Sequence, residues 1–413
     1  MLSTHYRFIA EGRILIFLSI ILSYVGCTND QTPQSIPEHI QELENVRIFD
    51  TDFETLPEVT LTEAAIYGDS HEVLMSGRIL ATGVDNSGRV YIAEPNQNIH
   101  VFNSDGSYKT EFGIEGQGPG EFERIRAIKT RNNKIHVLDE WQQKISVFKL
   151  NNENAELISE YNISLTELVD QPDWLSRTQE KGLMYRPTSL YITPNEEYKI
   201  GYSDRIIRSD ENVEGRTTEI TLYNPDQRKF TYNQVLSFNW TGRVVIEEVD
   251  ERTIVVPQVP YKRDTKMDFR DGRWLAGWND EFLIRFYNEM GSYTKAIYYS
   301  DPNQKLTQSD VERYYNDAHN MIRNAVLEDE HPETWPAYQN LFWDDQQRVW
   351  ISRLDDDPTT TELIVVDSDG EPQARLELPA KSDIQKIANG NVYVTEKKEE
   401  EFSYVVRYKF SQI

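Results

Sequence analysis

The sequence predicts an all-β fold made of repeated four-stranded antiparallel sheets. A short meander of strands and turns begins near residue 84, and related segments recur through the rest of the 413 residues. A single meander of this kind cannot bury its own apolar faces, so the copies are expected to pack against one another. The repeat therefore indicates the fold class before any single element is placed.

The best-preserved copy extends from Val84 to Phe122. Its apolar runs are Val90–Ala93, Ile99–Phe102 and a weaker run that ends at Phe112. Turn residues separate these runs, with N-S-G at 86–88, P-N-Q-N at 95–98 and S-D-G at 104–106. Runs of β-branched and aromatic residues bounded by Gly, Asn, Asp and Pro are typical of consecutive antiparallel strands.

Two patterns repeat along the chain. A hairpin, in which an apolar residue and a polar turn precede an alternating strand, recurs at Val84–Glu94, Ile128–Asp139, Leu190–Tyr202, Met267–Asp280, Phe342–Ser352 and Ile387–Glu396. An outer-strand pattern follows several copies, as V-F-N-S-D-G-S-Y from Val101, F-Y-N-E-M-G-S-Y from Phe286 and V-V-D-S-D-G-E-P from Val365. Four-stranded copies spaced by roughly 40 to 75 residues are the signature of a β-propeller. We predict six blades, with five or seven as alternatives because the third and fourth copies are the least regular.

The last predicted strand, Phe402–Phe410, needs a neighbour that protects its edge. An N-terminal strand, either Val46–Phe49 or Val59–Leu61, is expected to supply it and so close the ring of blades.

One segment departs from the β pattern. Residues 307–329 carry apolar side chains at helical spacing, with Ser309 and Glu312 placed as a capping box and His331-Pro332 after the end. We expect one helix inserted between the fourth and fifth blades, either as a structural lid or as the wall of a binding surface.

The first residues have the pattern of an export signal. Arg7 and Arg13 precede an apolar run, Ile14–Val25, which is short for a membrane helix and suits a secretory signal. Cys27 follows Gly26 and is the only cysteine, so no intramolecular disulfide is possible. A lone cysteine at this place resembles the lipobox of bacterial lipoproteins, in which the cysteine is lipidated and becomes the mature N-terminus. The expected organisation is a signal peptide (1–26), a flexible tether (27–44) and a propeller domain (45–413).

The charge balance limits the range of partners. The chain has 69 acidic and 43 basic residues, a formal net charge of −26. Such a charge repels nucleic-acid phosphates and anionic headgroups, so we expect no nucleic acid as a partner and membrane attachment only through the N-terminal lipid.

The segment G-I-E-G-Q-G-P-G-E-F, from Gly113 to Phe122, resembles the link between blades in NHL-repeat and TolB-like propellers. The flanking stretches Ile92–Phe102 and Val137–Phe148 resemble the core pattern of the NHL family. Together with the lipobox-like start, the chain is similar to six-bladed propeller lipoproteins of Bacteroidetes-type bacteria. The resemblance implies a protein exported to the cell envelope and anchored by lipid at the outer membrane. It implies no single activity, because propellers serve as enzymes, binding modules and scaffolds.

Candidate site residues come from two groups. The histidines show no metal-ligand spacing, and no nucleophile motif is present. Five acids stand at or just past the ends of predicted strands, where they either converge near the axis or accept backbone N–H bonds in turns: Glu94, Asp139, Glu140, Asp280 and Glu396. Trp274 and Trp278 are four apart in a predicted strand and point to the same side, as stacking platforms for a sugar or peptide or as packing between blades.

Two functions follow as hypotheses. The first is a non-catalytic, lipid-anchored module that binds a protein, peptide or glycan of the envelope, without a cofactor. The second is a hydrolase or lyase with an axial site, and calcium or zinc is expected only in that case.

Overall fold

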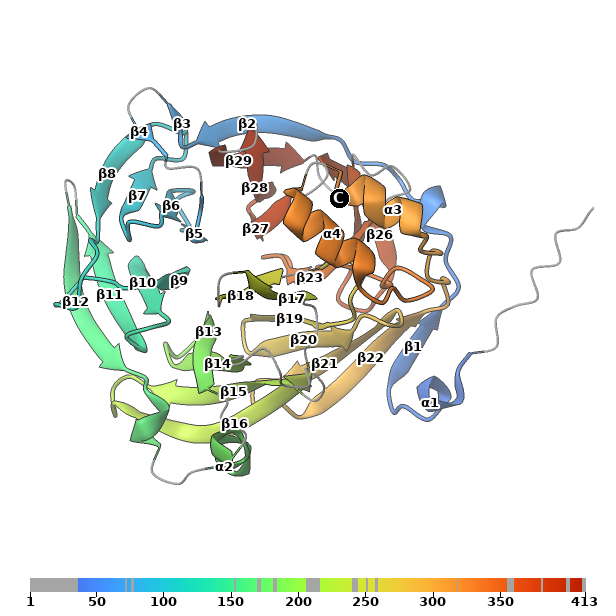
Figure 1. The fold of residues 1–413 in the computed structure, drawn as a ribbon, viewed down its shortest axis with the longest axis horizontal. Coiled ribbons are helices and arrows are strands. Elements are labelled where there is room, and N and C mark those ends of the chain that lie inside the picture. The colour runs from blue at the N-terminus through green and yellow to red at the C-terminus, as the bar shows by residue number, and fades with distance from the viewer. Residues whose placement is uncertain are drawn as a thin grey trace, which may run out of the picture. The chain divides into compact units, whose positions relative to one another are not determined.

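The strands of the computed structural model form six blade sheets around one axis, five with four antiparallel strands and one in which a fifth strand is added to the four (Figure 1). The structure describes residues 36–413 except 71–72, 76–77, 152–153, 169–171, 181–183, 206–215, 240–243, 250–251, 257–258, 317, 355–359, 380–381, 399–401 and 411–413. Residues 37–413 form one compact unit. The predicted six-bladed β-propeller is confirmed.

The first three blades follow one another along the chain. Blade 1 contains β5 (Ala81–Val84), β6 (Val90–Ala93), β7 (Ile99–Phe102) and β8 (Tyr108–Phe112). Blade 2 contains β9 (Ile125–Arg131), β10 (Lys134–Asp139), β11 (Lys144–Leu150) and β12 (Ala155–Asn162). Blade 3 contains β13 (Met184–Ile192), β14 (Tyr198–Arg205), β15 (Thr217–Asn224) and β16 (Lys229–Asn239).

The last three blades include two strands from the N-terminal region. Blade 4 contains β19 (Thr265–Arg270), β20 (Arg273–Trp278), β21 (Leu283–Asn288) and β22 (Tyr293–Tyr299), with β1 (Val46–Phe49) as a fifth strand. Blade 5 contains β23 (Asn340–Trp343), β24 (Val349–Leu354), β25 (Thr360–Val366) and β26 (Pro372–Pro379). Blade 6 contains β27 (Asp383–Ala388), β28 (Asn391–Lys398), β29 (Phe402–Phe410) and β2 (Leu61–Tyr67).

The remaining elements connect or precede the blades. Two hairpins are β3 (Asp69–Ser70) with β4 (Val73–Leu74), and β17 (Val244–Val249) with β18 (Arg252–Val256). The helices are α1 (Glu38–Gln41), α2 (Asp173–Glu180), α3 (Gln308–Tyr314) and α4 (Asn320–Glu328), with the 3₁₀ turns η1 (Phe53–Thr55) and η2 (Leu165–Glu167). Helix α1 lies inside the stretch 27–44 that was expected to be a tether, and its Ile40 is fully buried.

An N-terminal strand closes the ring, as predicted. β2 pairs antiparallel with β29, and Leu61 lies opposite Phe410. The two candidate segments have different places. The one ending at Leu61 leads into β2, whereas Val46–Phe49 is β1, which pairs in parallel with β22 of blade 4. The alternation of side chains along β2 explains why this strand pairs at the edge of blade 6, because Ala65 and Tyr67 point into an apolar cluster with residues of blades 6 and 1.

The insertion between blades 4 and 5 is helical, but the prediction of a single helix was wrong. α3 ends at Tyr314 and α4 begins at Asn320, and the two helices pack on each other on the face toward the viewer in Figure 1. The capping box is formed by Thr307 and Asp310 and not by Ser309 and Glu312. The His319 side chain caps α4 by accepting a hydrogen bond from the Met321 backbone N–H, so a second helix begins within the segment that was predicted as one helix.

The apolar core is divided into layers between neighbouring blades. Separate clusters join blades 1 and 2, 2 and 3, 3 and 4, 4 and 5, and 5 and 6, and a further cluster joins blade 6 to blade 1. Each blade buries both of its faces, which explains the nearly continuous burial of strands such as β6 and β7. The inner strands of the blades surround the axis.

Candidate functional site

The inner strands of all six blades line a cavity on the axis. Its volume is about 390 Å³, within the range of about 300 to 1,000 Å³ that is usual for small-ligand sites. The lining consists of 82–84 of β5, 128–131 of β9, 190–192 of β13, 267–270 of β19, 340–343 of β23 and 384–387 of β27. In the longer strands these residues lie toward the C-terminal end, next to the turn into the second strand of the blade.

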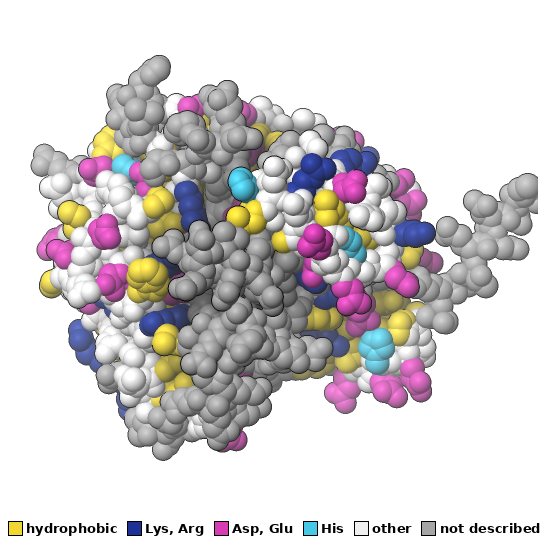
Figure 2. Space-filling view, viewed as in Figure 1, with side chains coloured by type: hydrophobic (Ala, Val, Ile, Leu, Met, Phe, Trp, Pro, Cys, Tyr) yellow, Lys and Arg dark blue, Asp and Glu magenta, His cyan; other side chains and the backbone are white. Residues whose placement is uncertain are grey.

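The charged side chains of this lining are mostly basic. They are Lys129, Arg131, Arg270 and Lys386, against the single acid Asp268. The whole chain has a formal charge of −26, so this balance does not follow from composition. In Figure 2, acidic side chains are scattered over the outer part of the visible face, with basic and apolar ones between them.

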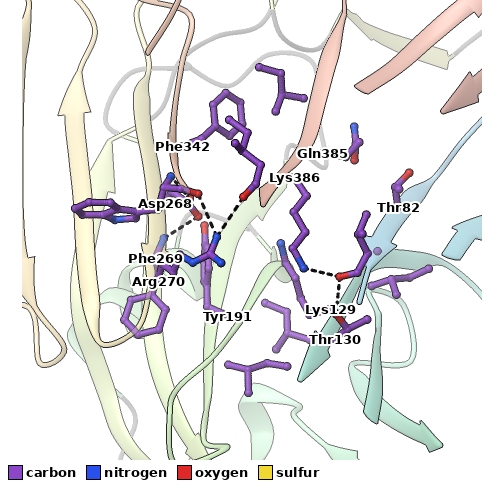
Figure 3. A pocket seen from close by; sticks show the side chains of 18 of the residues that line it. Thr82, Lys129, Thr130, Tyr191, Asp268, Phe269, Arg270, Phe342, Gln385 and Lys386 are labelled. Carbon is purple, nitrogen blue, oxygen red and sulfur yellow. Dashed lines mark hydrogen bonds between the residues drawn. The ribbon is translucent and has the colours of Figure 1, made fainter. Parts of the chain in front are cut away.

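Two of the cations also connect blades. The Arg270 guanidinium donates through Nη1 to the carbonyl oxygens of Trp343 and Ile387, at 3.4 Å each. Lys386 Nζ donates to the carbonyl oxygen of Val84 at 2.5 Å. Figure 3 shows the Arg270, Lys129 and Lys386 side chains arranged around one space. Because backbone carbonyls hold Arg270 and Lys386, their charges have fixed positions in the cavity.

Burial changes the titration of two groups here. Burial, together with the nearby charges of Arg270 and Lys129, lowers the pKa of Lys386 to about 8, and Asp85 and Asp345 oppose this shift. Burial raises the pKa of Asp268, although its carboxylate accepts backbone N–H bonds from Trp343 and Phe269 at 2.8 Å each. Burial therefore disfavours the charged form of Asp268, the one acid among the described residues of the lining, although the charges of Lys129 and Arg270 act in the opposite direction.

A second, smaller cavity adjoins the first. Its volume is about 280 Å³, and it shares Asn340 and Phe342 with the axial cavity. Tyr314 of α3 contributes to its wall, together with residues that precede β19 and residues of β24, β25 and β27. Of the two inserted helices, α3 thus provides part of the wall of this second cavity.

None of the five acids singled out from the sequence belongs to the axial lining. The register explains why: Asp139 at the end of β10 lies opposite Ile125, at the start of β9. The lining residues of β9 instead lie opposite the first part of β10. Acids at the ends of second strands therefore lie toward the other end of the blade.

Each of these acids has a local partner. Glu94 is buried and lies 2.6 Å from His100 Nε2, and Asp139 accepts backbone N–H bonds around the adjoining turns. Glu140 is buried 3.3 Å from the Arg124 guanidinium, and Asp280 pairs with Arg263 at 2.5 Å. Glu396 accepts a hydrogen bond from the Tyr408 hydroxyl at 2.7 Å. In the described part of the chain, no group of three or more His, Cys, Asp or Glu side chains is placed to hold a metal ion.

The two tryptophans have different surroundings. Trp274 is fully buried, with ring centroids of Phe269 and Tyr191 at 4.7 and 5.1 Å, so it packs between blades 3 and 4 and has no free face for a ligand. Trp278 is partly buried at the other end of β20, opposite Thr265. Cys27 lies outside the described residues. Among the described helices, none is long and apolar enough to span a membrane.

Sequence reasoning missed the axial cations. They stand in the first strand of a blade, shortly before its hairpin turn, as K-T-R at 129–131, F-R at 269–270 and Q-K at 385–386. A basic residue repeated at this place of the hairpin is the signal that points to them. This signal can be interpreted only when it is known that the first strand of each blade is the innermost one.

This arrangement is that of a six-bladed β-propeller with a cavity on its axis. A family model described as DUF5128, 6-bladed beta-propeller, matches residues 73–258. No curated protein matches the sequence.

Several solved structures of low sequence identity match most of the chain. A Bacteroides fragilis protein described as exported is 11% identical, with 89% of this chain and 99% of that chain covered and a TM-score of 0.45. A DUF4221 family member from Bacteroides vulgatus is 12% identical, with coverages of 86% and 96% and a TM-score of 0.44. A calcium-binding protein, regucalcin, from Agrobacterium tumefaciens is 12% identical, with coverages of 86% and 96% and a TM-score of 0.42.

Proposed function

We propose that this protein is an exported, lipid-anchored binding module of the cell envelope, which takes part of a glycan, peptide or protein into its axial cavity. The observation that carries the proposal is the cavity itself, to which every blade contributes its inner strand. A ligand-sized space with several polar groups at fixed positions is the usual form of a binding site.

A binding role is preferred to a hydrolase or lyase because the candidate acids lie apart, each with its own partner. The export and anchoring part of the proposal rests on the signal-like start and on Cys27.

The test compares a blocked cavity with an intact one. Asn340 is exposed and lines both cavities, so Asn340→Trp places an indole in the space; Gln373→Trp puts the same side chain at an exposed position of the outer strand of the same blade. The fluorescently labelled full-length chain is applied in detergent to arrays of envelope glycan fragments and peptides. We expect wild type and Gln373→Trp to bind the same compounds and Asn340→Trp to bind none. Equal binding by both variants, or turnover of a bound compound, contradicts the proposal.

A further inference from the structure

We propose that the axial cavity recognises an anionic group of its ligand, a carboxylate or a phosphate. This inference rests on the proposed function, because it specifies the chemistry of the group that enters the cavity. The geometry points to it through four basic side chains that come from three different blades and line one space.

The first step is the balance of charge. Lys129 and Arg131 come from β9, Arg270 from β19 and Lys386 from β27, whereas the lining contains one acid, Asp268. Both oxygens of Asp268 already accept backbone N–H bonds, and among the described residues it lies within ion-pair distance of none of the four cations, although the charges of Lys129 and Arg270 lower its pKa. The lining is therefore electropositive within a strongly acidic chain.

The acids just outside the lining do not remove this excess. Asp271 lies 3.9 Å from Arg131 and 3.8 Å from Arg270, so these ion pairs are at the outer limit of contact, and Asp271 is half-exposed. Asp85 is held by Arg89 at 2.7 Å and Tyr91 at 3.0 Å, and Asp345 accepts the backbone N–H of Asn389 at 2.8 Å. The carboxylates of Asp85 and Asp345 are thus bound to groups in or next to hairpin turns.

Lys129 is the clearest sign of a missing anion. Its side chain is exposed, and its amino group has neither a hydrogen bond nor an ion pair within the described residues. Its contact there is the face of the Tyr191 ring, with the nitrogen 5.9 Å from the centroid. A lysine whose amino group has no hydrogen-bond or ion-pair partner among the described residues, directed into a cavity beside two fixed cations, is suited to bind an anion.

Arg270 supplies the directional part of the site. Its Nη1 is committed to two carbonyl oxygens, while Nη2 has no hydrogen-bond partner in the described part of the chain. A guanidinium held on one side presents its other N–H groups in a fixed orientation, which matches the two oxygens of a carboxylate or phosphate. Lys129 and Lys386 add positive charge on the opposite side of the same space.

The site also accounts for an unfavourable feature of the empty cavity. Like charges brought together in a partly buried space repel one another; the pKa of Lys386 is lowered mainly by burial and further by the charges of Arg270 and Lys129. An anion that binds between them removes this repulsion. The overall negative charge of the protein acts over longer distances and is screened within about 8 Å at physiological ionic strength, so it does not cancel the local attraction.

Calorimetric titration of the full-length chain in detergent tests the inference. The probes are inorganic phosphate and glucuronate, with glucose as the uncharged counterpart of glucuronate. We expect at least one anion to bind and glucose to bind at least about tenfold more weakly. The anion that binds identifies the group as a phosphate or a carboxylate.

Variants locate the binding. Lys129→Gln is expected to weaken anion binding about tenfold and Lys129→Arg to preserve it. Lys149→Gln, which removes an exposed lysine from β11 of the same blade, is expected to change it less than about twofold. Because the Lys129 amino group has no hydrogen bond or ion pair within the described residues, we expect unchanged melting temperatures, which show that the loss is not a folding defect.

Four outcomes overturn the inference. If Lys129→Gln and Lys149→Gln bind the anion equally, the anion lies elsewhere. If glucose binds as tightly as glucuronate, charge is not recognised. If neither anion binds but Asn340→Trp abolishes binding of an array compound, the proposed function holds and the anion inference fails. Absence of any cavity-dependent binding makes both fail.

Discussion

His136 shows how strongly one side chain is affected by the packing between blades. It lies on β10, is 1% exposed and forms a hydrogen bond of 2.9 Å between Nδ1 and the Tyr198 hydroxyl. Nε2 has no hydrogen-bond partner in the described part of the protein. Burial, with smaller effects of Lys134 and Arg131, lowers the pKa of His136 to about 4, although Glu196 opposes this.

This shift predicts a pH dependence of stability. Below pH 6.5 the unfolded chain binds a proton at His136, and the folded protein does so only near pH 4. The contribution is fully present above pH 6.5, and about 3 kcal/mol of it is lost as the pH falls toward 4. Urea unfolding at pH 7, 6 and 5 should show a smaller decrease for His136→Gln than for wild type. His39→Gln is the control at an exposed histidine, and equal slopes for all three proteins contradict the assignment.

Lys386 predicts a second pH effect, on ligand affinity. With a pKa of about 8, it carries its proton at neutral pH and loses it as the pH rises. The groups acting on it are Lys129, Arg270, Asp85 and Asp345. If an anion binds in the cavity, glucuronate affinity should decrease above pH 8 by up to about tenfold per pH unit. A constant affinity between pH 7 and 10 argues against a role of Lys386.

Gly106 shows why the outer-strand pattern contains glycine. It has φ +92°, and a Cβ at this position lies 2.6 Å from the backbone oxygen of Ile66 in β2. Gly370 repeats the arrangement at φ +92° against Ile297 of the preceding blade. Gly390 has φ +69°, but a Cβ at this position has no neighbour within 4 Å. A substitution there therefore measures the cost of the positive φ without the cost of a steric contact.

Alanine at these positions separates the two effects. Gly390→Ala is expected to reduce the free energy of unfolding by about 1 kcal/mol, from the positive φ alone. Gly106→Ala is expected to cost about 2 to 3 kcal/mol, because a backbone atom of the neighbouring blade must also move. Chemical denaturation measures both, and equal losses contradict a role of Gly106 between blades.

At the scale of elements, the closing strand and the additional strand have different roles. β2 is the fourth strand of blade 6, and its buried residues pack in the interface between blades 6 and 1. β1 is instead a fifth strand of blade 4, which already has four. Removing residues 45–75 is expected to lower the melting temperature sharply. Replacing 61–67 with Gly and Ser should account for most of this decrease, and replacing 46–49 for the smaller part. A melting temperature unchanged by the 61–67 replacement contradicts closure by β2.

Strands and hairpin turns were predictable because their signals are local. Asp85 and Asp344 bind their own turns in the same way: each accepts two backbone N–H bonds, the guanidinium of the arginine four residues on, and the polar group of the aromatic residue two further on. Such a motif can be recognised within seven residues. The break between α3 and α4 was missed because apolar periodicity continues across it and a histidine served as the second cap.

The candidate site was less predictable, because its geometry depends on register and on the order of strands around the axis. Glu94 and Asp139 stand at strand ends in the sequence, but which end of the blade they occupy follows from the pairing. Lys129 and Lys386 are far apart in the chain and carry no motif. Only the placement of their strands innermost brings them into one cavity.

At the scale of the whole molecule, the proposed attachment depends on Cys27. Labelling of expressing cells with radioactive palmitate is expected to mark the wild-type protein and not Cys27→Ala. The variant should partition into the soluble fraction after cell lysis. Equal labelling, or an unchanged distribution between membrane and soluble fractions, contradicts a lipid anchor at this residue.

The pairing of β2 with β29 has a consequence for the time course of folding. Leu61 of β2 pairs with Phe410 of β29. β2 is synthesised early, but blade 6 can form only after β29, near the end of the chain, has been synthesised. Contacts between distant parts of a chain form slowly, because the intervening loop must first be ordered. Until the C-terminal strand arrives, the surfaces of blades 6 and 1 that will face each other cannot be buried together. Because blade 6 needs the last strand of the chain, the propeller cannot finish folding while the chain is being synthesised. An incompletely folded chain is the form in which a polypeptide can be translocated across a membrane.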